Sequence, residues 1–121
     1  MALLPGPNSD WLPLSPSQAI VGASSTALTV PNPATQTPPV RNSGNMVVAA
    51  FLIPQNAAYW VRSDGSTATN SATGGSLKLN VGDYQIVYGL PALLKIRVIQ
   101  DAAGGGLLVN YYLYRNQPVG P

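Results

Sequence analysis

Apolar and polar residues alternate with a period of two along much of the chain after residue 46, and this period is typical of half-buried β-strands. The clearest case is 93–100, in which Leu94, Ile96 and Val98 share one face while a lysine and an arginine occupy the other. No stretch has the 3.6-residue period of a helix longer than one turn. The chain is therefore predicted to be all-β.

Other segments extend this β pattern. Residues 47–53 are apolar on both faces, which is typical of a central strand covered on both sides. Shorter strands are expected at 24–30, 58–63, 76–81, 84–88 and 107–115. The turn signal Gly82-Asp83 predicts that 76–81 and 84–88 pair as a hairpin. In the first of these two strands, three residues are expected to face inward: Leu77, Leu79 and Val81.

A second hairpin is expected at the end of the chain, where 93–100 and 107–115 flank a glycine-rich loop. In the register that pairs Gln100 with Leu107, the inward and outward faces agree along both strands. About seven short strands predict a β-sandwich or jelly-roll-like domain. A single open sheet would leave too much apolar surface in water.

Three parts are expected along the chain: an extended Pro-rich arm at 1–22, a β domain at 23–116 with a long Pro-rich loop at 31–45, and a C-terminal tail at 117–121. The prolines of the arm fix φ and remove amide donors, which favours extended backbone. The arm also carries five large apolar side chains: Leu3, Leu4, Trp11, Leu12 and Leu14. Either they fold back onto the domain or they lie in a groove on a neighbour. In the second case, deleting residues 1–17 would leave the β core folded.

Charge is scarce in this chain. Only 8% of the residues are charged, against about 25% in an ordinary soluble protein. Six basic and four acidic side chains on a surface of roughly 6,200 Å² leave about 620 Å² per charge, whereas a standard interface removes about 800 Å² from each partner. Uncharged patches of interface size are hard to avoid, so we expect assembly with other copies or other proteins. The alternative is a monomer covered by Ser, Thr, Asn and Gln.

The residue types in this chain argue against catalysis and metal binding. The chain has no His, no Cys and no Glu, so it lacks the commonest general base and the thiolate metal ligands. Its four Asp residues are dispersed; we therefore expect no enzyme activity, no metal and no cofactor. The bases are too scattered for nucleic-acid binding. No apolar run approaches the ~20 residues that span a bilayer, and no signal peptide is expected.

Alternation directs six side chains away from the predicted core: Trp60, Arg62, Lys95, Arg97, Tyr112 and Tyr114. Aromatic residues and Arg are enriched at contact hot spots. With Trp11 and Leu12 of the arm, these residues are predicted to form a partner or oligomer interface. The alternative is a solvated sheet face with ordinary cross-strand pairs, or one that a second sheet covers. If the interface exists, charge reversal at Arg97 combined with Tyr112→Ala weakens assembly without unfolding the domain.

A short motif follows the strand at 58–63, and a tyrosine-rich strand closes the chain. The residues concerned are Val61-Arg62, Asp64-Gly65-Ser66, Ala68-Thr69, Gly74 or Gly75, Leu77, and Val109-Asn110-Tyr111-Tyr112. With this motif, residues 58–115 resemble small virion proteins encoded among the structural genes of tailed bacteriophages. Those proteins have Thr where this chain has Ser66, and Pro where it has Ala68.

The resemblance implies a structural role in the virion. Capsid cement, or decoration, proteins are often small β domains with extended arms, set as trimers over gaps between capsid subunits. The chain is therefore expected to be a homo-oligomer, with a trimer favoured, that is made in the host cytoplasm, binds the major capsid protein at the capsid surface and stabilises the shell. One alternative is a tail, baseplate or fibre component that binds tail proteins and a host-surface glycan through Trp60, Tyr112 and Tyr114. The other is a soluble cellular binding module without a virion.

Overall fold

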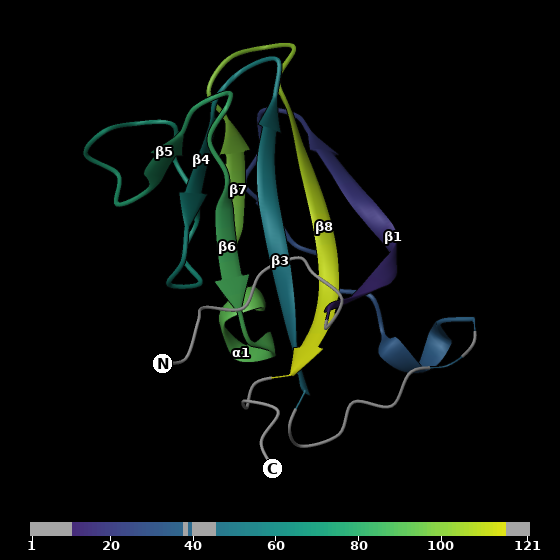
Figure 1. Ribbon diagram of the computed structural model, residues 1–121. Helices are drawn as coiled ribbons and strands as arrows, with labels where there is room; N and C mark the ends of the chain where they lie inside the picture. The colour runs from purple at the N-terminus through teal and green to yellow at the C-terminus, as the bar shows by residue number, and fades with distance from the viewer. Residues whose placement is uncertain (1–10, 38, 40–45, 116–121) are drawn as a thin grey trace, which may run out of the picture.

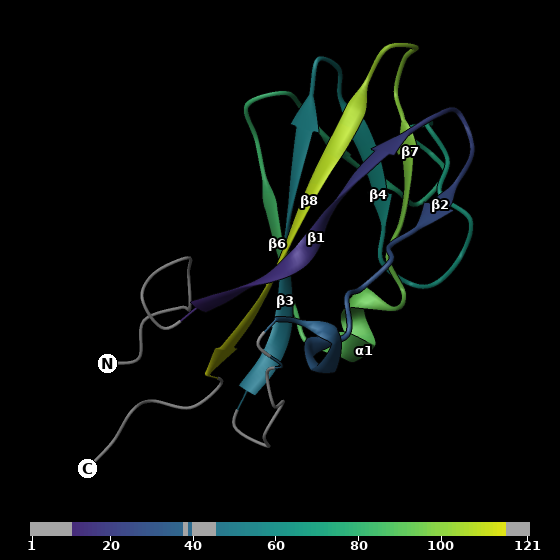
Figure 2. The ribbon, with the colours of Figure 1, turned by 90° about the vertical axis from the view of Figure 1, so that its right-hand side faces the viewer.

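The computed structural model describes residues 11–37, 39 and 46–115, with backbone alone at 46, 47, 114 and 115. Its elements are β1 (Trp11–Val21), β2 (Thr26–Ala27), the 3₁₀ turn η1 (Pro33–Thr35), β3 (Met46–Gln55), β4 (Tyr59–Arg62), β5 (Leu77–Leu79), β6 (Gln85–Tyr88), α1 (Leu90–Leu93), β7 (Arg97–Gln100) and β8 (Gly106–Arg115). The strands form two four-stranded antiparallel sheets, with orders β1-β8-β3-β6 and β2-β7-β4-β5 (Figure 1). The two sheets pack as the two layers of a sandwich (Figure 2). The predicted all-β sandwich is confirmed.

Strand β3 lies in the interior of the first sheet, between β8 and β6, as its continuous apolar sequence predicts. One of its faces, with Val48, Ala50 and Leu52, is buried in the core between the sheets. The other face, with Ala49 and Phe51, packs against aromatic side chains of neighbouring strands. Both faces of β3 are thus covered, which explains why neither carries a polar residue before Gln55 at the end of the strand.

Both predicted hairpins are wrong, because the members of each pair lie in different sheets. Strand β7 pairs with β2 and β4, whereas β8 pairs with β1 and β3. Likewise β5 pairs with β4, and β6 pairs with β3. A two-residue period determines which side chains face the core, but it is the same whether the next strand lies beside its predecessor or across the core from it. Ile96, Val98, Val109 and Tyr111 do belong to one buried cluster, but two lie on each layer.

Three apolar residues expected to face inward are exposed. Leu77 and Val81 have exposed fractions of 62% and 55%, so that Leu79 alone of its segment reaches the core. Leu94 is 66% exposed because the short helix α1 precedes it, and this turn buries Leu93 instead. Figure 1 shows α1 at one end of the sandwich, beside the first sheet.

Residues 11–21, expected as part of an extended arm, form the edge strand β1 along β8. The side chains of Trp11 and Leu14 are buried, with 5% and 3% exposed. Its prolines are tolerated because a strand at a sheet edge has one side free of ladder hydrogen bonds. Residues 1–10 of the expected arm and the expected tail at 117–121 lie outside the described residues.

The pairing of β1 with β8 is interrupted between Leu14 and Gln18. There the side chain of Gln36 supplies the missing partners: its Oε1 accepts from the Ser15 amide at 2.8 Å, and its Nε2 donates to the Ser15 carbonyl at 2.8 Å. Gln18 makes a second connection, since its Oε1 accepts from the Thr29 amide and from the Tyr111 hydroxyl. The described part of the Pro-rich loop is thus bonded to β1 through Gln36, and Gln18 links β1 to Tyr111 on β8.

Candidate functional site

The outer face of the first sheet carries a cluster of aromatic side chains. We call this surface the aromatic face; it consists of Trp11, Ala49, Phe51, Tyr84, Ile86, Tyr88 and Tyr112. Cross-strand pairing brings the residues together: Ala49 lies between Tyr88 on β6 and Tyr112 on β8, and Phe51 pairs with Ile86. The face thus extends over all four strands of the sheet.

Edge-to-face contacts connect the rings, as the quadrupoles of aromatic side chains favour. The Trp11 ring lies with its centroid 5.3 Å from that of Tyr112 and 5.8 Å from that of Phe51, at steep interplanar angles. Phe51 also stacks in parallel on Tyr84, with centroids 5.6 Å apart and planes 10° apart. Tyr84 is 61% exposed, whereas Trp11 is buried beneath its neighbours. The cluster therefore has a buried centre, half-buried rings around it and one exposed ring, Tyr84.

Charge is almost absent from this sheet. In the four strands β1, β3, β6 and β8, Arg115 at the last position of β8 is the one charged residue. Ser17 Oγ and Asn110 Oδ1, two polar atoms on the same sheet, are bonded to each other at 2.8 Å. When one face of an antiparallel sheet is exposed to water, the side chains on that face are normally polar. An uncharged face that carries the exposed Tyr84 ring is a candidate contact surface.

The outer surface of the second sheet, in contrast, carries basic side chains. We call this surface the basic face; it consists of Trp60, Arg62, Lys78 and Arg97 on paired strands. The Trp60 ring is almost buried, with 9% exposed; its Nε1 donates to Asp101 Oδ1 at 2.7 Å, and Lys78 Nζ lies 5.8 Å from its centroid. Lys78 also lies 3.9 Å from Asp101 Oδ2. Among the described residues, no ion pair involves Arg97.

The predicted interface strip is therefore divided between two surfaces on opposite sides of the sandwich. Trp60, Arg62 and Arg97 lie on the basic face, and Lys95 lies exposed in the turn before β7. Trp11 and Tyr112 lie on the aromatic face, and Leu12 is 42% exposed on the same edge strand. For Tyr114 the backbone alone is described, and it pairs with Trp11 and Val47. The prediction that these residues form one surface was wrong, because it assumed that β7 and β8 are neighbouring strands.

Five members of the aromatic face were not predicted from the sequence as interface residues: Ala49, Phe51, Tyr84, Ile86 and Tyr88. A signal for them was present. The apolar run around Phe51 has two apolar faces, and only one can face the core of a two-layer sandwich. The residues at 84, 86 and 88 are apolar or aromatic at every second position, so they share a face of their own.

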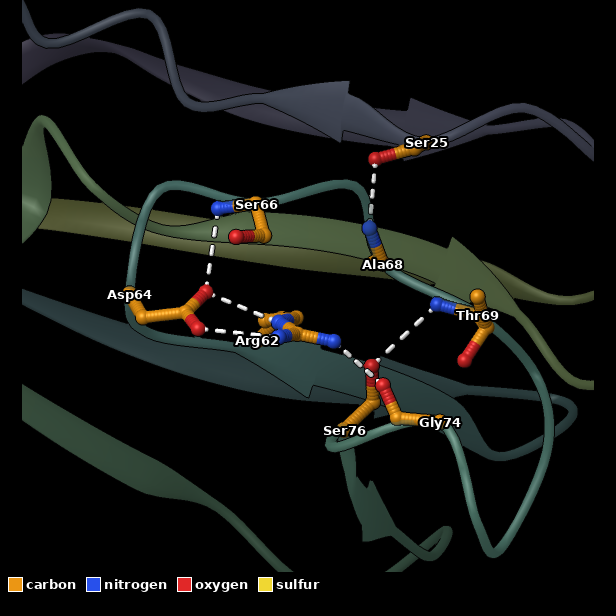
Figure 3. Close-up of polar contacts among 8 residues, drawn as sticks. All are labelled: Ser25, Arg62, Asp64, Ser66, Ala68, Thr69, Gly74 and Ser76. Carbon is orange, nitrogen blue, oxygen red and sulfur yellow. Dashed lines mark hydrogen bonds and ion pairs between the residues drawn. The ribbon is translucent and has the colours of Figure 1, made fainter.

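The motif that carries the resemblance to phage proteins forms the loop after β4 (Figure 3). Arg62 organises this loop, because its guanidinium binds both carboxylate oxygens of Asp64, with Nε–Oδ1 at 2.8 Å and Nη2–Oδ2 at 2.9 Å. Its Nη1 donates to the Gly74 carbonyl at the far end of the loop. Asp64 Oδ1 also accepts from the Ser66 amide at 3.0 Å. The hydrogen bond from Arg62 holds the pKa of the Asp64 carboxyl well below its usual range.

Two further bonds fix the returning half of the loop (Figure 3). The Ala68 amide donates to Ser25 Oγ at 2.9 Å, and the Thr69 amide donates to Ser76 Oγ at 3.2 Å. Gly74 has to be glycine, since a Cβ there would overlap Thr69 Oγ1. The motif thus specifies a shaped loop, and its Arg–Asp pair is a structural contact.

Replacing Gly75 is expected to disturb this loop more than replacing Gly65. Both residues have positive φ, of 82° and 85°, so Gly65→Ala is expected to cost about 1–2 kcal/mol through backbone strain alone. At Gly75 the added Cβ would also lie 2.7 Å from Arg62 Nη1, whereas nothing lies within 4 Å of it at Gly65. Thermal unfolding of the two variants measures the difference. Equal melting temperatures would show that Arg62 does not hold the loop.

The described residues include no cluster of three or more potential metal ligands, and no helix among them has the length and apolarity needed to cross a membrane. Comparisons with family models, with curated proteins and with solved structures found no match to this chain. The two outer faces, one aromatic and one basic, are the candidate contact surfaces of the described residues.

Proposed function

We propose that this chain is a non-enzymatic structural protein of a tailed-phage virion that binds the outside of the capsid as a cement protein and stabilises the shell. The observation that carries the proposal is the pair of contrasting outer faces, an almost charge-free aromatic face and a basic face, which suit a protein that contacts more than one partner. The resemblance of residues 58–115 to small phage virion proteins supports the virion as its location. A cement protein needs contact surfaces and no catalytic groups.

A sandwich with two different outer faces can contact two partners at once. Many copies bound to a symmetric shell gain affinity through multivalency, so each single contact can be modest. We assign attachment to the shell to the basic face, where Arg97 and Lys95 are available for acidic groups of the major capsid protein. This assignment leaves the aromatic face for a different partner.

Neutralising Arg97 is expected to weaken binding to the shell several-fold. Arg97→Gln removes a positive charge that no ion pair of the described residues uses, whereas Lys78→Gln removes one that already lies near Asp101. Both variants change the net charge equally and lie on the same sheet, so Lys78→Gln is the matched control. Occupancy on purified shells, titrated at low and high salt, is the measurement. Occupancy of Arg97→Gln equal to that of the unchanged chain would exclude the basic face as the attachment surface.

The location itself is tested by reconstructing the particle and counting copies of the chain. Density on the capsid surface, together with shells that resist heat better when the chain is added, supports cement. The chain's absence from the capsid would contradict it.

A tail, baseplate or fibre component that binds glycan is the second candidate function. The observation that favours it is the exposed Tyr84 ring stacked on Phe51, because sugar rings pack on such flat aromatic surfaces. Trp60, expected to stack on sugar, is too deeply buried for that role. Glycan binding by the isolated protein, together with labelling at the tail, would favour this candidate over cement.

A further inference from the structure

We infer that the aromatic face is the surface through which two copies of this chain pair, sheet against sheet. The inference deepens the proposed function and rests on it for the contact role of this face. It assigns the partner as a second copy of the chain.

Charge is the first argument for a second copy. In a two-fold symmetric interface the same patch meets itself, so any charged residue near the axis approaches its own like charge. The aromatic face has no charged residue and avoids this repulsion. The basic face would place Arg97 and Lys78 of both copies against each other. Of the two outer faces, the aromatic face is therefore the one that can pair with a second copy of itself without repulsion between like charges.

The second argument is chemical. A partner rich in charge would lose hydration against this face and gain no counter-charge, which costs free energy. A second aromatic face instead offers rings to rings, and Tyr and Trp are the residues most enriched at interface hot spots. The exposed Tyr84 ring can pack against the same ring of the other copy, with its hydroxyl left at the boundary with water.

The size of the face is sufficient for a modest dimer. With strands about 4.8 Å apart and 3.4 Å per residue, the sheet covers roughly 450 Å² in projection, because β1, β8 and β3 pair over eight to ten residues while β6 pairs with β3 over four. This projected area approaches the roughly 600 Å² per partner of small specific interfaces. Two such sheets would pack about 10 Å apart with strands nearly aligned. We therefore expect association in the micromolar range.

The test measures the mass of the full chain in solution. Sedimentation or light scattering from about 1 to 500 μM is expected to show a monomer–dimer equilibrium. Tyr84→Lys, which brings like charges together across the axis, is expected to raise the dissociation constant at least tenfold. Leu77→Lys is the matched control, because Leu77 is 62% exposed against 61% for Tyr84 but lies on the other sheet. This control is expected to leave the equilibrium unchanged.

Three outcomes would overturn the inference. They are a monomer at all concentrations, a trimer in place of a dimer, and equal effects of Tyr84→Lys and Leu77→Lys. Circular dichroism confirms that both variants are folded, which their exposed positions favour. The outcome is separable from the proposed function. A monomer that still coats shells would refute the pairing alone, whereas a dimer that is absent from particles would refute the virion role alone.

Discussion

Replacing Leu14 with alanine is expected to lower the free energy of unfolding by about 2–5 kcal/mol, whereas the same replacement of Leu12 should lower it by less than about 1 kcal/mol. Leu14 is 3% exposed and lies in the core between the sheets, so its removal leaves a cavity. Leu12 is 42% exposed on the same strand, where water fills the space that the shortened side chain leaves. Urea unfolding followed by circular dichroism measures both changes.

The pair of variants distinguishes a strand from an arm. If residues 11–21 were an arm that binds only a neighbour, neither replacement would change the stability of the isolated chain. Equal unfolding midpoints for both variants and the unchanged protein would therefore refute the placement of β1. Because β1 supplies Trp11 and Leu14 to two packed clusters, deleting residues 1–17 is expected to unfold the domain. Such a deletion does not separate binding from folding.

Raising the pH above 10 is expected to destabilise the domain by several kcal/mol. Burial raises the pKa of Tyr111 and of Tyr59 above the ordinary value of about 10. Both hydroxyls are hydrogen-bonded in the folded protein, to Gln18 Oε1 at 2.6 Å and to the Ile20 carbonyl at 2.8 Å. Below pH 10 both states hold these protons. Above it the unfolded chain ionises first, so stability falls by at most about 1.4 kcal/mol per pH unit for each group.

Tyr111→Phe is the variant that tests this cause. It removes one of the two buried hydroxyls, and Gln18 Oε1 keeps its bond from the Thr29 amide, so at neutral pH the cost should be only about 1 kcal/mol. Between pH 10 and 12 the variant should lose stability less steeply than the unchanged chain. Tyr84→Phe, at an exposed ring, is the control and should follow the unchanged chain. An identical pH dependence for all three proteins would show that Tyr111 is accessible to solvent.

The division of charge between the sheets bears on how such a protein can assemble. Three bases lie on β4, β5 and β7, and the aromatic face carries none. The double change of Arg97 and Tyr112, suggested by the sequence alone, therefore alters two opposite surfaces at once. Single changes on each face would separate the proposed attachment to a shell from the proposed pairing between copies.

Much of the secondary structure could be predicted from local patterns. Period-two alternation identified Ile96 and Val98 as core residues, and the apolar run around Leu52 identified the interior strand β3. These predictions succeeded because the face that a side chain takes depends on the pleat of its own strand. The low charge content also predicts a contact surface, but it carries no information on which sheet would provide that surface.

The sequence by itself determined the all-β class, the sandwich and most of its inward-facing residues. Only the tertiary structure decided which strands are neighbours, and with them the candidate site. Strand pairing depends on contacts between distant segments, such as Gln36 with Ser15, that leave no local period in the sequence. The same long-range pairing places Trp11 in a sheet, although the strand that contains it has two prolines. It also places Tyr112 and Arg97 on opposite faces of the sandwich.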